Sequence, residues 1–168
     1  MNDNHEYFMD VALEHARAEI GIGGRPIGSV IVKDGKIVGR GINTVVADKN
    51  PSAHAEVEAI RDACSKLRTL DLSGSTLYTT MEPCPACLAT AILEAQIKRV
   101  VLGGRHARLG RKDLGDYSVE SFLAFTKRDD VAVIAGVREA ECDQLRSEWL
   151  RSLSDKQLRL ETLRSLSA

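Results

Sequence analysis

Met81-Glu82-Pro83-Cys84-Pro85-Ala86-Cys87 is the stretch from which the organisation of this chain can be worked out. Cys84 and Cys87 are three residues apart, and side chains at that spacing share one face of a helix, so both thiols can reach one metal ion. Pro85 suits the first position of a helix, because the backbone N–H that proline lacks has no partner there. The stretch therefore predicts two thiolates on the opening turn of a helix, whose positive dipole end favours the charged form.

His54-Ala55-Glu56 supplies the second half of the predicted site. One imidazole and two thiolates leave the fourth position of a tetrahedral zinc ion open to water, and open zinc sites are catalytic. His54 and Glu56 would point to different sides of a helix interior, so we expect them at its N-terminal end, with Ser52 as the N-cap. Glu56 beside the zinc's water could accept a proton from it and donate one to a leaving amine.

A zinc ion that only staples two helices is the alternative interpretation, and it would make the chain a binding module without turnover. Glu56 argues against this alternative, since stapling requires no carboxylate beside the metal. The order His-x-Glu followed by Pro-Cys-x-x-Cys is instead the known signature of zinc-dependent base deaminases.

Composition limits the other possibilities. A length of 168 residues predicts a single domain over residues 1–168. With 23 basic and 24 acidic residues the net charge is −1, which gives no general attraction to nucleic acid or to an anionic membrane. No apolar run approaches membrane-spanning length. We therefore expect a cytoplasmic protein without a membrane partner, in which Cys64 and Cys142 are buried free thiols.

Hydrophobic periodicity and turn residues predict the order of the elements. We expect a helix over residues 6–20, ended by glycines at 21, 23 and 24, and then a hairpin of strands 28–32 and 37–42. The later elements are predicted as helix 53–67, strand 75–80, helix 86–95, strand 99–103, helix 118–125, strand 131–135 and helix 139–153.

This order predicts an α/β fold with three layers, α/β/α. Its five-stranded mixed sheet would begin with the antiparallel hairpin and continue with parallel strands. A helical tail is expected over about residues 139–168. Within it Leu160, Leu163 and Leu166 form a stripe that suits core packing or a subunit contact.

Residues 98–112 contain six basic side chains and no acidic one. One interpretation is a solvated loop whose charge is offset by Asp113 and Asp116. The other is a rim that attracts an anionic substrate group or a nucleic-acid backbone. Spacing alone leaves both open.

Over about residues 1–150 the chain resembles the cytidine-deaminase-like superfamily. The similar motifs are Gly23-Gly24-Arg25-Pro26-Ile27-Gly28, Gly41-Ile42-Asn43, Pro51-Ser52-Ala53-His54-Ala55-Glu56 and the run from Leu77 to Cys87. The resemblance implies one zinc ion per subunit, a homodimer or larger assembly, and hydrolytic release of ammonia from an aromatic amine.

The resemblance also implies roles for individual residues. His54, Cys84 and Cys87 would be the zinc ligands, Glu56 the proton shuttle, and Asn43 a contact to the base.

Further substrate contacts are expected around these residues. The resemblance implies that Ile27, Ala55 and Glu82 line the pocket through side chains or backbone. From their bulk and their position after the metal motifs, we expect the loop that contains Arg108 and the helix that contains Trp149 to close over the substrate.

The nearest branches are the fungal-type cytosine deaminases, bacterial guanine and related heterocycle deaminases, and tRNA adenosine deaminases. We expect deamination of a free nucleobase or base-like heterocycle, cytosine-like first and guanine-like or triazine second. The alternative is a tRNA-specific adenosine deaminase, which converts adenosine to inosine. Against it, residues 108–117 are bulkier and more charged than is usual in that branch, and residues 138–168 hold six basic and six acidic residues rather than a basic tail.

Overall fold

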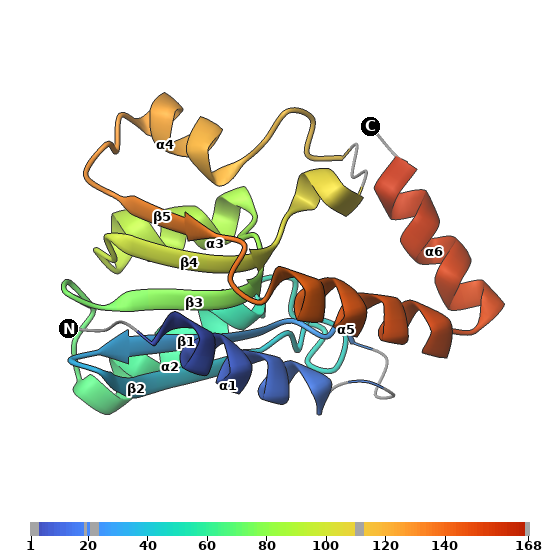
Figure 1. Cartoon of the computed structure of the whole chain (residues 1–168), viewed down its shortest axis with the longest axis horizontal. Coiled ribbons are helices and arrows are strands. Elements are labelled where there is room, and N and C mark those ends of the chain that lie inside the picture. The colour runs from blue at the N-terminus through green and yellow to red at the C-terminus, as the bar shows by residue number, and fades with distance from the viewer. Residues whose placement is uncertain (1–3, 19, 21–23, 110–112, 167–168) are drawn as a thin grey trace.

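A five-stranded mixed sheet forms the middle layer, with strands in the order β2-β1-β3-β4-β5 (Figure 1). The computed structural model describes residues 4–18, 20, 24–109 and 113–166, except for the side chains of residues 163–166. β1 is antiparallel to β2 and β3, whereas β3, β4 and β5 run parallel. The strands are β1 Gly28–Lys33, β2 Lys36–Ile42, β3 Thr76–Met81, β4 Arg99–Gly104 and β5 Ala132–Ala135.

The hairpin between β1 and β2 closes through two residues with positive φ, Asp34 at 50° and Gly35 at 71°. Such a turn matches the twist of the two strands, and Asp-Gly is a favoured pair for it. β3 is buried along its whole length and β4 along all but its first residue, as expected for parallel strands covered on both faces.

Helices cover both faces of the sheet, so the predicted three-layer fold is confirmed (Figure 1). One hydrophobic core lies between the sheet and α1 with α5, and the other lies between the sheet and α2, α3 and α4. The helices are α1 His5–Arg17, α2 Ala55–Leu67, α3 Pro85–Ala89, α4 Val119–Thr126, α5 Glu139–Ser152 and α6 Asp155–Leu166.

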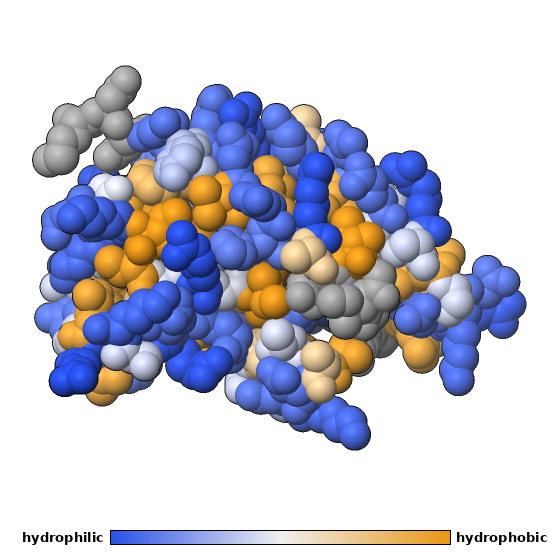
Figure 2. Space-filling view, turned by 90° about the horizontal axis from the view of Figure 1, so that it is seen from below, coloured by the Kyte–Doolittle hydropathy of each residue, from blue (hydrophilic) through white to orange (hydrophobic). Residues whose placement is uncertain are grey.

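Hydrophilic side chains dominate the face seen in Figure 2, with hydrophobic ones visible between them. Among the described helices, none has the length and apolar character needed to cross a membrane.

The start of α2 differs from the sequence-based prediction. His54, not Ser52, occupies the N-cap position, with φ −76° and ψ 152°, while the Ser52 hydroxyl bonds to Asn50 Oδ1 at 2.8 Å. Ser52 therefore lies two residues before the N-cap and does not cap the helix as predicted. As a result, the imidazole leaves the chain just before the first helical turn.

Alanines make up much of the buried face of α2. Ala59 and Ala63 are fully buried, whereas Cys64 is only partly buried, so the prediction that Cys64 is a buried thiol is wrong. Opposite these alanines, a Cβ placed on Gly41 of β2 would come within 2.1 Å of the Ala55 carbonyl oxygen. Glycines in β2 and alanines in α2 thus let the two backbones approach closely.

Other elements also differ in detail. The predicted helix 86–95 is α3 followed by a π-helical turn, Thr90–Glu94. α1 ends at Arg17 instead of residue 20, and the glycines expected to end it at 21 and 23 lie outside the described residues. Leu160 in α6 is 54% exposed, so of the two predicted roles for this leucine, core packing is not seen and a subunit contact stays a prediction.

Candidate active site

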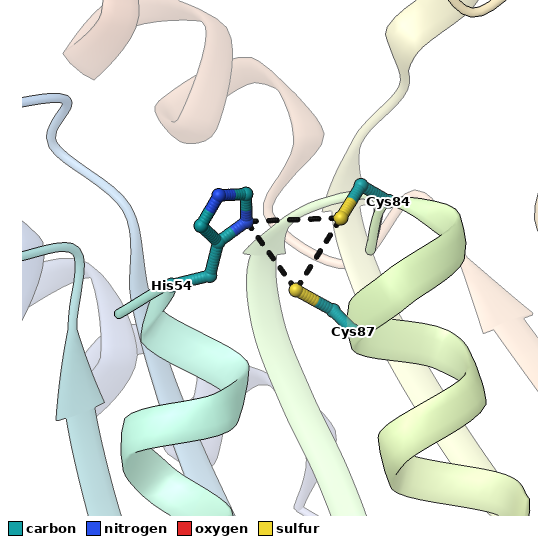
Figure 3. A group of neighbouring side chains, drawn as sticks. All are labelled: His54, Cys84 and Cys87. Atoms are coloured by element: carbon teal, nitrogen blue, oxygen red, sulfur yellow. Dashed lines mark hydrogen bonds between the residues drawn. The ribbon is translucent and has the colours of Figure 1, made fainter. Parts of the chain in front are cut away.

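The predicted metal ligands come together at one point (Figure 3). His54 Nδ1 lies 3.7 Å from Cys84 Sγ and 3.3 Å from Cys87 Sγ, and the two sulfur atoms are 3.5 Å apart. Tetrahedral zinc with ordinary bond lengths requires about 3.8 Å between two sulfurs and about 3.5 Å between nitrogen and sulfur. The donor set and its spacing therefore fit a zinc ion.

Two helix N-termini hold these ligands. His54 is the N-cap of α2, and Cys84 is the N-cap of α3 with ψ 166°. Pro85 occupies the first turn of α3 as predicted, and Cys87 lies in that same turn. Both helices direct the positive ends of their dipoles at the metal position, which favours thiolates there.

The two thiols share one negative charge when no metal is bound. The hydrogen bond with Cys87 and the contact with His54 lower the pKa of Cys84 to about 3. The same hydrogen bond, together with burial, raises the pKa of Cys87. A bound dication favours the thiolate form of both residues, so zinc binding would release the proton of Cys87.

Glu56 lies beside this group, in the first turn of α2, and is 3% exposed. Burial raises its pKa to about 7. A carboxyl group with that pKa can both accept and release a proton near neutral pH, although a metal ion nearby would lower the value.

A pocket opens over His54, Glu56 and Cys84. Of the predicted substrate contacts, Ile27, Asn43 and Glu82 line it. Asn43 is 4% exposed, and its backbone N–H is fixed by a 3.1 Å hydrogen bond to the Ile27 carbonyl oxygen. The sequence analysis assigned no substrate contact to the other lining residues, namely Arg25, Pro26, Thr80, Met81, His106, Leu109, Cys142, Arg146 and Glu161.

Three predicted substrate contacts are not brought to this pocket. Ala55 is fully buried and Trp149 is 2% exposed, and neither is among the pocket-lining residues. Arg108 points elsewhere, because its guanidinium pairs with Glu139 at 3.2 Å and Asp143 at 2.8 Å. The side chains of Arg108 and Trp149 therefore do not line the pocket, but both predicted segments lie at it, through His106 and Leu109 of the loop and Cys142 and Arg146 of the helix.

An ion pair between distant segments lies at the pocket instead. Arg25 Nη2 is 3.0 Å from Glu161 Oε2, and the two side chains are 25% and 19% exposed. Arg25 belongs to the glycine-rich motif before β1, so its sequence context could have identified it. Glu161 lies in α6, where no sequence pattern pointed to a role.

Acidic partners offset several charges of the basic stretch 98–112. Lys98 pairs with Asp130 at 2.9 Å, and Arg105 pairs with Glu82 and Glu120 at 3.0 Å and 2.7 Å. Glu82, Glu120 and Asp130, which the sequence did not suggest as partners, thus offset charges of this stretch. Arg111 and Lys112 lie outside the described residues.

Comparison with known proteins matches residues 2–104 to the cytidine and deoxycytidylate deaminase zinc-binding region. The tRNA-specific adenosine deaminase of Haemophilus influenzae is 35% identical over 164 residues, which cover 96% of this chain and 92% of that protein. Its counterpart from Buchnera aphidicola is 33% identical over 90% of this chain and 91% of that protein. The guanine deaminase of Bacillus subtilis is 48% identical over 105 residues, or 61% of this chain and 66% of that protein.

Similar solved structures also include both guanine deaminases and tRNA deaminases. A guanine deaminase from Nitrosomonas europaea superimposes with a TM-score of 0.73 and 28% identity, covering 86% of this chain and 84% of that one. A tRNA:A34 deaminase structure gives a TM-score of 0.70 and 33% identity, covering 83% of this chain and 98% of that one.

Proposed function

This chain belongs to the cytidine and deoxycytidylate deaminase family, and from that premise we propose that it hydrolytically deaminates a free aminated heterocycle. The relatives reported above act on adenosine in tRNA or on guanine. We therefore rank a guanine-like aminopurine before the cytosine-like ring that the sequence placed first.

The residues around the pocket can perform this reaction. When bound, the zinc ion lowers the pKa of water and so supplies the nucleophile. Glu56 would take the proton from the attacking water and return protons to the ring nitrogen and the departing ammonia. Asn43, with its side chain at the pocket, would hold the ring by amide hydrogen bonds. A heterocycle without matching groups would leave this buried amide unpaired, which disfavours its binding.

The Arg25–Glu161 ion pair is the observation that supports a free base over a nucleic acid. It links the loop before β1 to α6 at the pocket that holds His54 and Glu56. A planar ring is small enough to be enclosed behind such a pair, whereas a stem-loop requires a clear path to the metal. The pairing of Arg105 and Arg108 with acidic side chains also makes these cations less available to phosphates.

Deamination of adenosine in tRNA is the second candidate, and the sequence relatives favour it. The identity to tRNA-specific adenosine deaminases extends over 96% of the chain, but that to the Bacillus guanine deaminase extends over only 61%. The comparisons thus support this candidate more strongly than the first, whereas the ion pair at the pocket supports the first.

Ammonia release tests the proposal. Zinc-loaded protein would be incubated with guanine, 2,6-diaminopurine, adenine, cytosine and an aminotriazine, alongside chelator-treated protein. We expect release from at least one aminopurine, its loss with the chelator, and its return with added zinc. No release from any free ring would contradict the proposal.

A further inference from the structure

A buried carboxylate close to the zinc-binding cysteines has no role in the proposed proton transfers. The Glu82 side chain is 1% exposed and lies two residues before Cys84. It accepts three hydrogen bonds, from Arg105 Nη1 at 3.0 Å, from the His106 backbone N–H at 2.9 Å and from the Val119 backbone N–H at 3.0 Å. Burying a carboxylate is costly without such donors, so the three bonds fix its position firmly.

These donors belong to two segments that pack beside the cysteine loop. Arg105 and His106 follow β4, and Val119 begins α4. The backbone of Glu82 is tied to the same place, because its N–H donates to the Gly104 carbonyl at 2.8 Å. Glu82 therefore joins the end of β3, the loop after β4 and the N-terminus of α4.

Both ends of this junction reach the pocket. On one side the chain continues through Pro83, whose carbonyl oxygen accepts a 2.6 Å bond from the Tyr117 hydroxyl, to Cys84. On the other side His106, 5% exposed, forms part of the pocket lining. A displacement of the Glu82 carboxylate would move a zinc ligand and a pocket wall together.

We propose that Glu82 is a positioning residue, whose carboxylate holds Cys84 and His106 in fixed places around the reaction centre. Its part in metal binding rests on the Cys84 geometry, and its part in turnover rests on the proposed function. Among the described residues, the hydrogen bonds of its carboxylate go to Arg105, His106 and Val119, so it acts through other residues.

Glu120 offers a matched control. It bonds to the same guanidinium, with Arg105 nitrogens at 2.8 Å and 2.7 Å, but its side chain is 53% exposed. Glu120→Gln removes one negative charge beside Arg105 without touching the N–H groups of His106 and Val119. Glu82→Gln removes the same charge but turns an amide NH₂ toward one or more of those donors.

The test measures zinc affinity, the visible spectrum of the cobalt(II)-substituted protein, and kcat and KM on the best free base. We expect Glu82→Gln to lower zinc affinity by about 10–100-fold, as loss of a supporting partner does in other metal sites. The cobalt–thiolate absorption should shift and kcat should fall about 10-fold or more, because small displacements of reacting groups are costly. Glu120→Gln should leave all of these readouts close to wild type.

Wild-type zinc affinity, cobalt spectrum and kcat in Glu82→Gln would overturn the proposal, and so would an equal loss in Glu120→Gln. If Glu82→Gln does not fold, Glu82→Asp decides the question, because the shorter carboxylate cannot keep all three bonds. Intermediate losses of zinc affinity and kcat in Glu82→Asp would support the proposal, and wild-type values would overturn it. The two metal readouts need no substrate. A wild-type protein inactive on free bases would therefore contradict the proposed function alone.

Discussion

His54 and Cys84 are the N-cap residues of α2 and α3, with extended ψ angles of 152° and 166°. Within a helix, the side chains of His54 and Glu56 would point to different sides. Because His54 lies just before the first turn of α2, its side chain and that of Glu56 can reach the same site. The sequence predicted the ligand set and the use of the helix end, because the motif is compact. It did not locate the cap itself, since the capping residues of a short loop depend on side-chain bonds such as that of Ser52 to Asn50.

Glu56→Gln should abolish most turnover while zinc stays bound. A glutamine of the same size cannot transfer protons, and such transfer contributes about 10²–10⁴-fold to the rate. Glu58→Gln is the control, because the largely buried side chain of Glu58 pairs with Arg61 within α2 and does not line the pocket. Ammonia release and zinc content would be measured for both, and Glu56→Gln within 10-fold of wild type would remove Glu56 from the mechanism.

Cys87→Ser should lose zinc, whereas Cys64→Ser should keep one ion per chain. Cys87 is one of three ligands within 4.8 Å of each other, but Cys64 is a partly buried thiol of α2 outside that group. Metal analysis after dialysis, with circular dichroism to verify folding, checks this expectation. Full zinc in Cys87→Ser would mean that the ligand set is different.

At the scale of elements, the strands were easier to predict than the helix faces. The hairpin follows from Asp34-Gly35, β3 follows from β-branched and aromatic residues, and β4 follows from a short apolar run. The close contact of α2 with β2 was missed, because it depends on glycines and alanines that carry little hydrophobic signal. The π-helical turn after α3 was missed for a related reason: an extra residue in a turn hardly changes the apolar pattern.

Gly41→Ala should destabilise the protein and weaken zinc binding. Its Cβ would lie 2.1 Å from the Ala55 oxygen and 2.3 Å from the Ala59 nitrogen, both backbone atoms, so α2 must move. Overpacking of this kind costs about 1–3 kcal/mol, and a shift of α2 would also move its N-cap, His54. Urea unfolding and zinc titration would be compared with Arg40→Ala, at an exposed neighbour in β2. Equal stability in Gly41→Ala and wild type would contradict this packing.

At the scale of the whole molecule, the pocket is completed by a residue from the far end of the chain. Arg25 and Glu161 are separated by 136 residues and meet only because α5 returns along the sheet and α6 follows it (Figure 1). No local pattern could predict this pairing, because it is fixed by the tertiary arrangement. The predicted loop and helix do lie at the pocket, but other residues of these segments line it in place of Arg108 and Trp149, because bulk does not reveal where a side chain is directed.

Glu161→Gln should raise KM for the free base with little effect on zinc content. A partly exposed ion pair contributes up to about 1 kcal/mol, which corresponds to a change of up to about 5-fold. Glu148→Gln is the control, since Glu148 is a partly exposed residue of α5 that accepts a bond from Gln144 and does not line the pocket. Steady-state kinetics of both variants test this expectation, and an unchanged KM in Glu161→Gln would show that the ion pair does not help to enclose the substrate.

One paired measurement tests the central claim most directly. A single zinc-loaded preparation would be assayed for ammonia release from guanine and, in parallel, for inosine formation in a tRNA anticodon stem-loop. We predict a higher kcat/KM for the free base, and deamination of that base should be unaffected by added stem-loop. Inosine formation in the stem-loop, with no turnover of guanine or any other free base, would contradict the account and establish the tRNA activity instead.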